Sequence, residues 1–190
     1  IGCFSMNCMK GLASCGEAGL VVTDNQAVYD QLTALRYHGL VNREYSQWLS
    51  HNGRIDTMQA AILNYRLTRI EEVIEARRYN ARYYNTRLGN LVGTPVEEES
   101  NFDVYYTYTI RTPKRDQLRD YLTTKGIETK IQHPILMPQQ PIYEVGAQGS
   151  FDNARNLVEQ ILCLPANEKI SEEQRAYVAD HVQAFFTDGD

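Results

Sequence analysis

Short runs of β-branched residues alternate along this chain with segments of helical periodicity. Residues 20–23, Leu-Val-Val-Thr, read as a buried strand. Residues 26–37 come next, and their apolar side chains Val28, Leu32 and Leu35 recur at the spacing of one helix face. Strands that alternate with helices along a chain typically form a sheet covered by helices. The sequence therefore predicts an α/β protein.

The same patterns predict further elements. Asp24 or Asn25 is expected to cap the helix that begins at residue 26, Asp56 the next helix, and Ser171 forms a capping box with Gln174. The polar segment 38–53 and the proline-punctuated segment 134–141 are predicted to be loops. The further predicted helices are 57–67, 70–88, 112–125 (with Gly126 as its stop), 151–162 and 171–186, and the further predicted strands are 104–111 and 128–131.

A change of composition divides the chain near its middle. Residues 89–101 contain Gly93, Pro95 and the acidic run 97–99, which suits a crossover between domains. We therefore predict two domains, 1–90 and 91–190.

Composition excludes several classes of protein. The chain has 190 residues, of which 43% are hydrophobic, and a formal net charge of −5. Nucleic-acid binding needs a concentrated excess of Lys and Arg, so this class is not expected. No apolar run approaches the roughly 18 residues of a membrane span, so we expect no membrane partner and a cytoplasmic location.

The cysteines Cys3, Cys8, Cys15 and Cys163 form no C-x-x-C pair. We expect them to be reduced, apolar side chains packed in a core, and we expect no metal. A metal module built from the first three is the alternative. The chain opens without Met and enters directly a mixed apolar and polar stretch, which suggests a piece of a longer protein.

Lys10 is the side chain most suited to covalent chemistry. It lies among apolar residues with few acidic neighbours, a setting that can lower an amine pKa and favour attack on a carbonyl carbon. The alternative is an ordinary surface lysine. Spacing alone leaves both open.

A series of motifs adds to this interpretation. Ser5-x-x-x-x-Lys10 is followed by Gly16-Glu17-x-Gly19 and a β-branched strand. In this order they resemble the DegT/DnrJ/EryC1/StrS family of sugar aminotransferases. The later matching segments are Leu35-Arg36-Tyr37-His38-Gly39, Asn52-Gly53-Arg54-Ile55-Asp56 with Gln59-Ala60-Ala61, Tyr105 to Arg111, Gly126 to Thr129, Gln140-Pro141-x-Tyr143 and Leu162 to Pro165.

The resemblance implies a fold and a cofactor. It implies the C-terminal part of the large domain of a pyridoxal-phosphate (PLP)-dependent transferase of fold type I, followed by a small α+β C-terminal domain. Lys10 matches the lysine that bonds covalently to pyridoxal 5'-phosphate and moves protons. Ser5 matches a serine that contacts the cofactor phosphate. Asn52 matches an asparagine that reaches the phosphate in the neighbouring subunit, which implies a homodimer.

The resemblance also implies a reaction: transfer of an amino group from an amino acid, glutamate or glutamine, to a keto sugar nucleotide or a keto-cyclitol. Arg54 and His133 are the candidate substrate-binding residues. For Arg54, binding of a substrate anion and pairing with Asp56 are both open. Ser5 and Asn52 could be ordinary turn residues, and His133 could be structural.

The sequence departs from the family pattern in places. Many members have His-Tyr-Pro where this chain has Gln132-His133-Pro134, and Gly11 stands where Asn is usual. Members are about twice this length, and the other half normally supplies the carboxylate that pairs with the pyridine nitrogen. We therefore expect this chain alone to be a weak catalyst or none. The alternative of another class is a non-catalytic subunit or interaction module derived from the family.

Overall fold

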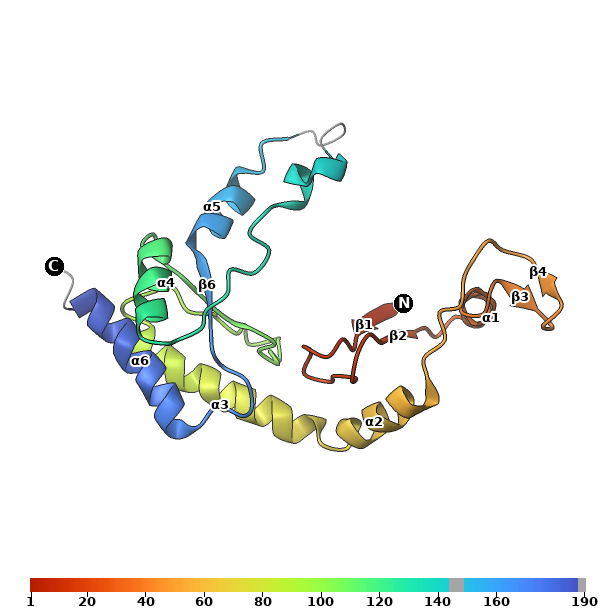
Figure 1. The fold of residues 1–190 in the computed structure, drawn as a ribbon, viewed down its shortest axis with the longest axis horizontal. Coiled ribbons are helices and arrows are strands. Elements are labelled where there is room, and N and C mark those ends of the chain that lie inside the picture. The colour runs from red at the N-terminus through yellow and green to blue at the C-terminus, as the bar shows by residue number, and fades with distance from the viewer. Residues whose placement is uncertain (144–148, 188–190) are drawn as a thin grey trace. The chain divides into compact units, whose positions relative to one another are not determined.

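The computed structural model describes residues 1–143 and 149–187, and the chain forms two compact units (Figure 1). We call Ile1–Glu72 the N-terminal unit and Val73–Asp190 the C-terminal unit. The division falls near the start of helix α3 (Ile70–Leu88). No helix in the described ranges has the length and apolar character needed to span a bilayer. The composition is mixed α and β, as predicted.

The N-terminal unit begins with an antiparallel pair, β1 (Gly2–Ser5) and β2 (Gly19–Val22), in which Ser5 lies opposite Gly19. The strand predicted at 20–23 is confirmed, but β1 was not predicted. The predicted burial is wrong, since Leu20, Val21 and Val22 are each 45% exposed. A two-stranded sheet pairs its backbone but does not by itself bury the side chains on its faces.

The predicted core packing of the cysteines holds for one residue of four. Cys163 is buried in the C-terminal unit, whereas Cys3, Cys8 and Cys15 are exposed on β1 and the loop after it. All four are free thiols. The expectation of core packing is therefore wrong for the first three, because the β1–β2 hairpin encloses no core.

Helices α1 (Gln26–Leu35) and α2 (Thr57–Leu67) confirm two predictions. Asn25 caps α1, since its Oδ1 accepts a hydrogen bond from the Val28 amide at 3.2 Å. Asp56 occupies the N-cap position of α2 but makes no capping hydrogen bond through its side chain, so that prediction is wrong.

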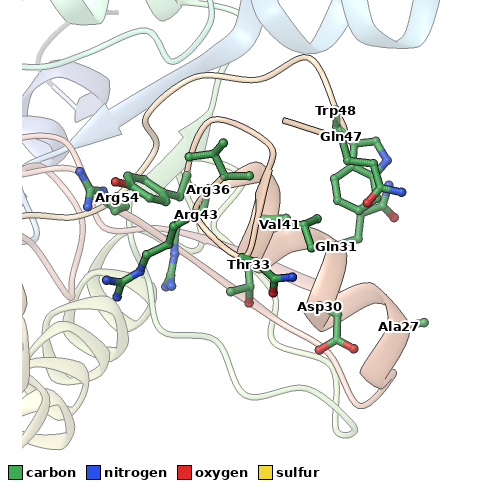
Figure 2. A pocket seen from close by; sticks show the side chains of 14 residues that line it. Ala27, Asp30, Gln31, Thr33, Arg36, Val41, Arg43, Gln47, Trp48 and Arg54 are labelled. Carbon is green, nitrogen blue, oxygen red and sulfur yellow. The ribbon is translucent and has the colours of Figure 1, made fainter. Parts of the chain in front are cut away.

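The segment between these helices is more regular than predicted. It contains the short antiparallel pair β3 (Leu40–Val41) and β4 (Tyr45–Ser46). The turn before β3 requires a glycine at position 39. Gly39 has φ +68° and passes so close to the Trp48 carbonyl oxygen that a Cβ would lie 1.9 Å from it. This segment and α1 line a cavity of about 1000 Å³ (Figure 2).

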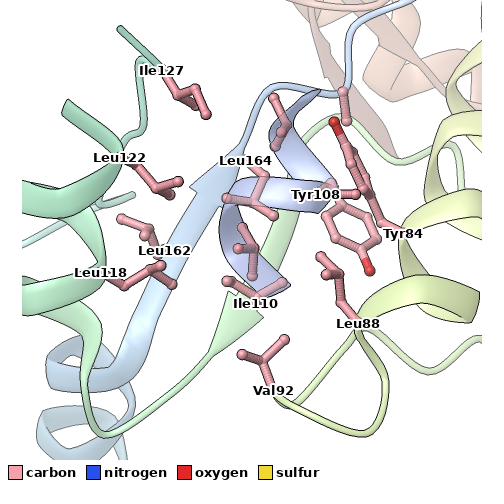
Figure 3. Close-up of a cluster of buried hydrophobic side chains, with 14 of the residues drawn as sticks. Tyr84, Leu88, Val92, Tyr108, Ile110, Leu118, Leu122, Ile127, Leu162 and Leu164 are labelled. Carbon is pink, nitrogen blue, oxygen red and sulfur yellow. The ribbon is translucent and has the colours of Figure 1, made fainter. Parts of the chain in front are cut away.

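The C-terminal unit is built on the antiparallel pair β5 (Tyr108–Arg111) and β6 (Ile161–Leu164). The core contains side chains from this sheet and from α3, α4 (Arg115–Thr124) and α6 (Glu172–Thr187), as Figure 3 shows. Its fully buried members include Tyr84, Leu88, Ile110, Leu118 and Leu162.

The C-terminal end of α4 and the N-terminal end of α6 follow the sequence signals, whereas α4 begins at Arg115 and not at residue 112 as predicted. Gly126, with φ +70°, follows α4 and ends it as predicted. Ser171 and Gln174 form the predicted capping box, in which the Gln174 amide donates to Ser171 Oγ at 3.1 Å and the Ser171 amide donates to Gln174 Oε1 at 3.0 Å.

Several predicted boundaries in this unit are wrong. The helix predicted at 151–162 is α5 (Asp152–Gln160), and the chain then forms β6. The strand predicted at 104–111 is ordered as β5 only from Tyr108, and the strand predicted at 128–131 is reduced to one bridge between Lys130 and Cys163. The loop 134–141 contains the 3₁₀ turn η1 (Met137–Gln139), and η2 (Pro141–Tyr143) begins at its last residue.

The two buried tyrosine hydroxyl groups of this core are hydrogen-bonded. The Tyr84 hydroxyl donates to the Pro165 carbonyl oxygen, and the Tyr108 hydroxyl donates to Asn85 Oδ1, both at 2.7 Å. Burial raises the pKa of both tyrosines, which therefore remain neutral donors.

Candidate functional site

Lys10 lies on the loop between β1 and β2, residues 6–18, which we call the Lys10 loop. Backbone hydrogen bonds close this loop across its width: the Met6 amide donates to the Ala18 carbonyl at 2.9 Å and the Cys8 amide to the Gly16 carbonyl at 3.1 Å. The Lys10 amide donates to the Asn7 carbonyl at 2.9 Å. Lys10 itself is half-buried. The predicted lysine is therefore held on an ordered turn.

The side chain of Asn7 makes hydrogen bonds within the Lys10 loop. Its side-chain nitrogen donates to Glu17 Oε1 at 2.5 Å, and its Oδ1 accepts from the Met9 amide at 2.9 Å. Glu17, which by sequence alone is only a loop residue, thereby ties the two sides of the loop together.

Helix α2 holds the far side of the Lys10 loop. Gln59 Oε1 accepts from the Cys15 amide at 2.8 Å. Arg66 Nη1 donates to the Ala13 carbonyl at 2.5 Å. The sequence identified Gln59 only as part of a family motif and gave no reason to single out Arg66. The family motif that contains Gln59 is therefore the sequence feature that could have pointed to this contact.

Ser5 is the last residue of β1 and precedes the Lys10 loop directly. Its side chain is exposed, and its Oγ lies 3.5 Å from the Asn7 amide, a long contact. Ser5 and Lys10 are thus presented by one strand end and the turn that follows it.

Asn52 and Arg54 lie together on a different loop. Asn52 Oδ1 accepts from Arg54 Nε at 2.9 Å, and the Arg54 guanidinium carbon lies 4.2 Å from the centre of the Tyr37 ring. Tyr37 and Asn52 form a backbone bridge. The two motifs that contain these residues are therefore brought into contact. No ion pair between Arg54 and Asp56 occurs in the part of the chain that the structure describes.

Arg54 also lines the cavity next to α1, together with Arg36 and Arg43 (Figure 2). Asp30 is the acidic residue of that lining. An excess of guanidinium groups over carboxylates favours an anionic ligand there.

His133 belongs to the C-terminal unit. It is exposed, has φ +54°, and its Nε2 lies 3.1 Å from the side-chain nitrogen of Gln132. Both residues line a cavity of about 910 Å³ whose other walls are largely apolar and include Arg111 from β5. Within the described residues, the buried Gln132 Oε1 has no hydrogen-bond partner.

The cysteines give no support to a metal module. Across residues 1–143 and 149–187, no group of three or more His, Cys, Asp or Glu side chains is arranged to hold a metal ion.

Comparison with known proteins identifies the family. The profile of the DegT/DnrJ/EryC1/StrS aminotransferase family matches residues 1–183. The chain belongs to this family. The resemblance inferred from the ordered motifs is therefore confirmed.

Individual relatives give the same result. A pleiotropic regulatory protein of Geobacillus stearothermophilus is 33% identical over 183 residues, which cover 93% of this chain and 49% of the relative. A dTDP-3-amino-3,4,6-trideoxy-alpha-D-glucose transaminase of Streptomyces venezuelae is 31% identical over 187 residues, 96% of this chain and 49% of the relative. The chain therefore spans about half the length of the curated relatives that it matches.

A solved structure supports the fold. The crystal structure of DesV from S. venezuelae in complex with a ketimine intermediate matches with a TM-score of 0.94 and 31% identity, covering 97% of this chain and 51% of DesV.

Proposed function

We propose that this chain supplies the cofactor lysine of a pyridoxal 5'-phosphate-dependent aminotransferase. The enzyme would transfer an amino group from glutamate or glutamine to the keto group of a nucleotide-linked sugar or a keto-cyclitol. The observation that carries the proposal is Lys10 on a braced loop in a chain of this family. The transaminase relative, named for a dTDP-linked amino sugar, supports the acceptor class.

The residues present fit this cofactor. Lys10 offers a half-buried primary amine for an aldehyde, and Ser5 offers an exposed hydroxyl for a phosphate at the start of the same loop. When bound, pyridoxal phosphate supplies a carbonyl that takes up nitrogen and a ring that stabilises carbanion charge. Lys10 Nζ would hold the cofactor through its aldehyde group and, as a free amine, would take up and return a proton.

Other parts of the proposal concern recognition and assembly. Asn52 is proposed to donate to the cofactor phosphate of a second subunit in a homodimer. Arg54 would bind an anionic group of a substrate, and His133 would contact the acceptor. We further propose that residues 1–90 form the C-terminal part of the large domain and that residues 91–190 form the small α+β domain. We also propose that the enzyme is cytoplasmic.

Borohydride trapping tests the central claim. The purified chain is mixed with pyridoxal phosphate, reduced, and mapped by mass spectrometry. We expect the label on Lys10 in preference to Lys114, Lys125, Lys130 and Lys169, and we expect Lys10→Arg to lose the selective label. Label spread evenly over all lysines of the folded chain would contradict the proposal.

One finding favours a second function. The relative from G. stearothermophilus is named a regulatory protein. A non-catalytic subunit or interaction module of this family would fold normally yet show no preference for Lys10 in the trapping experiment. Selective labelling of Lys10 would therefore favour the first function over the second.

A further inference from the structure

The Lys10 loop is tied to helix α2 by a glutamine that lies far away in sequence. Gln59 Oε1 accepts from the Cys15 amide at 2.8 Å across 44 positions of the chain. The nitrogen of the Gln59 side-chain amide faces Gly16, where an added Cβ would come within 3.0 Å of Gln59 Nε2. Gln59 thus bonds to Cys15 and leaves little space for a side chain at the next loop residue.

A second tie comes from the same helix. Arg66 lies two turns after Gln59, and its Nη1 donates to the Ala13 carbonyl at 2.5 Å and to the Ser14 carbonyl at 3.5 Å. Ala13 and Ser14 are 7% and 2% exposed. Residues 13–16 are therefore fixed to one face of α2.

Hydrogen bonds carry this constraint across the loop to the lysine. The Ser14 amide donates to the Met6 carbonyl at 2.8 Å, and the Cys8 amide donates to the Gly16 carbonyl at 3.1 Å. Lys10 follows Cys8 by two residues. The segment before the lysine is therefore bonded to the segment that α2 holds.

We propose that Gln59 is a positioning residue for Lys10, acting through the hydrogen bond that it accepts from Cys15. This inference rests on the proposed function, because the group to be positioned is the amine that bonds to the cofactor. A displacement of about 1 Å can cost about 100-fold in the rate of a reaction between positioned groups, so a loop tie far from the amine can control its reactivity.

Two substitutions separate hydrogen bonding from space filling. Gln59→Met keeps a side chain of similar length but removes the acceptor, whereas Gln59→Glu keeps an oxygen acceptor. Gln117→Met on α4 is the matched control, since Gln117 is exposed and lies in the other unit. Gly16→Ala disturbs the same contact from the loop side, because its Cβ would press on Gln59 Nε2.

The readouts are the rate at which pyridoxal phosphate and borohydride label Lys10, relative to the other lysines, and the hydrogen exchange of the Cys15 amide. We expect Gln59→Met to lower the relative labelling of Lys10 about tenfold and to speed Cys15 exchange about fivefold. Gln59→Glu should restore both to within about twofold. Gly16→Ala should lower labelling about threefold, and Gln117→Met should change neither readout.

The outcomes are distinguishable. Selective labelling of the unsubstituted chain with equal labelling of Gln59→Met overturns the positioning role but leaves the proposed function standing. Equal losses in Gln59→Met and Gln59→Glu overturn it too, since the acceptor would then be irrelevant. If Gln59→Met loses its helices by circular dichroism, Gly16→Ala decides, and normal labelling of that variant overturns the role. An unsubstituted chain without preference for Lys10 overturns the proposed function and this inference together.

Discussion

Each of the two compact units is stabilised by a different kind of interaction. The C-terminal unit has a continuous apolar core in which Tyr84, Leu118 and Leu162 are fully buried. In the N-terminal unit, the buried apolar side chains among the described residues are Ala13, Ala34 and Leu63. Hydrogen bonds within the Lys10 loop and from α2 fix the loop in this unit.

This difference has a consequence for the proposed chemistry. A hydrogen bond contributes about 0.5–1.5 kcal/mol net, whereas a buried leucine contributes several times as much. The residues proposed to hold the cofactor therefore lie in the unit that is easier to open locally. Their geometry depends on a few named polar contacts rather than on a core.

Paired leucine substitutions test this contrast and should give the largest effect. Leu118→Ala removes a fully buried side chain from the C-terminal core and should lower the free energy of unfolding by about 2–5 kcal/mol. Leu20→Ala removes a side chain that is 45% exposed on β2 and should cost less than about 1 kcal/mol. Urea denaturation followed by circular dichroism measures both. Equal losses would show that the N-terminal unit has a core of comparable strength.

Helices were the most predictable part of the fold. The segment 70–88 was predicted with the bounds of α3, because its apolar positions recur at helical spacing over many turns. β6 was missed because Ile161–Leu164 is apolar at every position, and such a run fits either a helix or a strand until a partner strand is known. β1 has no alternating pattern, and its strand conformation comes from pairing with β2.

The candidate site was predictable in its residues but not in its geometry. The motifs pointed to Ser5, Lys10, Asn52 and Arg54, and their proposed roles remain predictions. The contact between Arg54 and Tyr37 could not be inferred, because nothing in the local pattern of either segment indicates the other. The same holds for Gln59, which reaches the Lys10 loop only through the path of the chain.

The stability of the C-terminal unit in acid should depend on the ion pair between Glu168 and Arg77. Glu168 pairs with the 9%-exposed Arg77 side chain at 2.8 Å. Burial alone would raise the Glu168 pKa, but a backbone hydrogen bond and Arg77 outweigh it, and the pKa lies below its ordinary value of 4.5. The ionised pair therefore stabilises the fold above that value, and this stability is lost as pH falls through the lowered folded-state pKa.

Glu168→Gln should lower the free energy of unfolding at pH 7 by about 1.5–3 kcal/mol and flatten its dependence on pH in acid. Glu72→Gln is the control from the N-terminal unit, because the Arg69–Glu72 pair is 58% and 66% exposed and should contribute at most about 1 kcal/mol. Urea midpoints measured at several acidic pH values provide the comparison. An unchanged acid slope in Glu168→Gln would assign the acid sensitivity to other groups.

Helix caps offer the smallest and most discriminating comparison, because each unit has a helix whose first turn is capped by a side chain. Ser171 caps α6 and Asn25 caps α1, and loss of either hydrogen bond should cost about 1 kcal/mol locally. α6 contributes Val178 and Val182 to the core, so Ser171→Ala should lower the midpoint of the cooperative transition. α1 contributes only Ala34 to the buried set, so Asn25→Ala should instead speed amide exchange in its first turn and leave that midpoint unchanged. An equal shift of the cooperative midpoint in both variants would mean that the two units unfold as one.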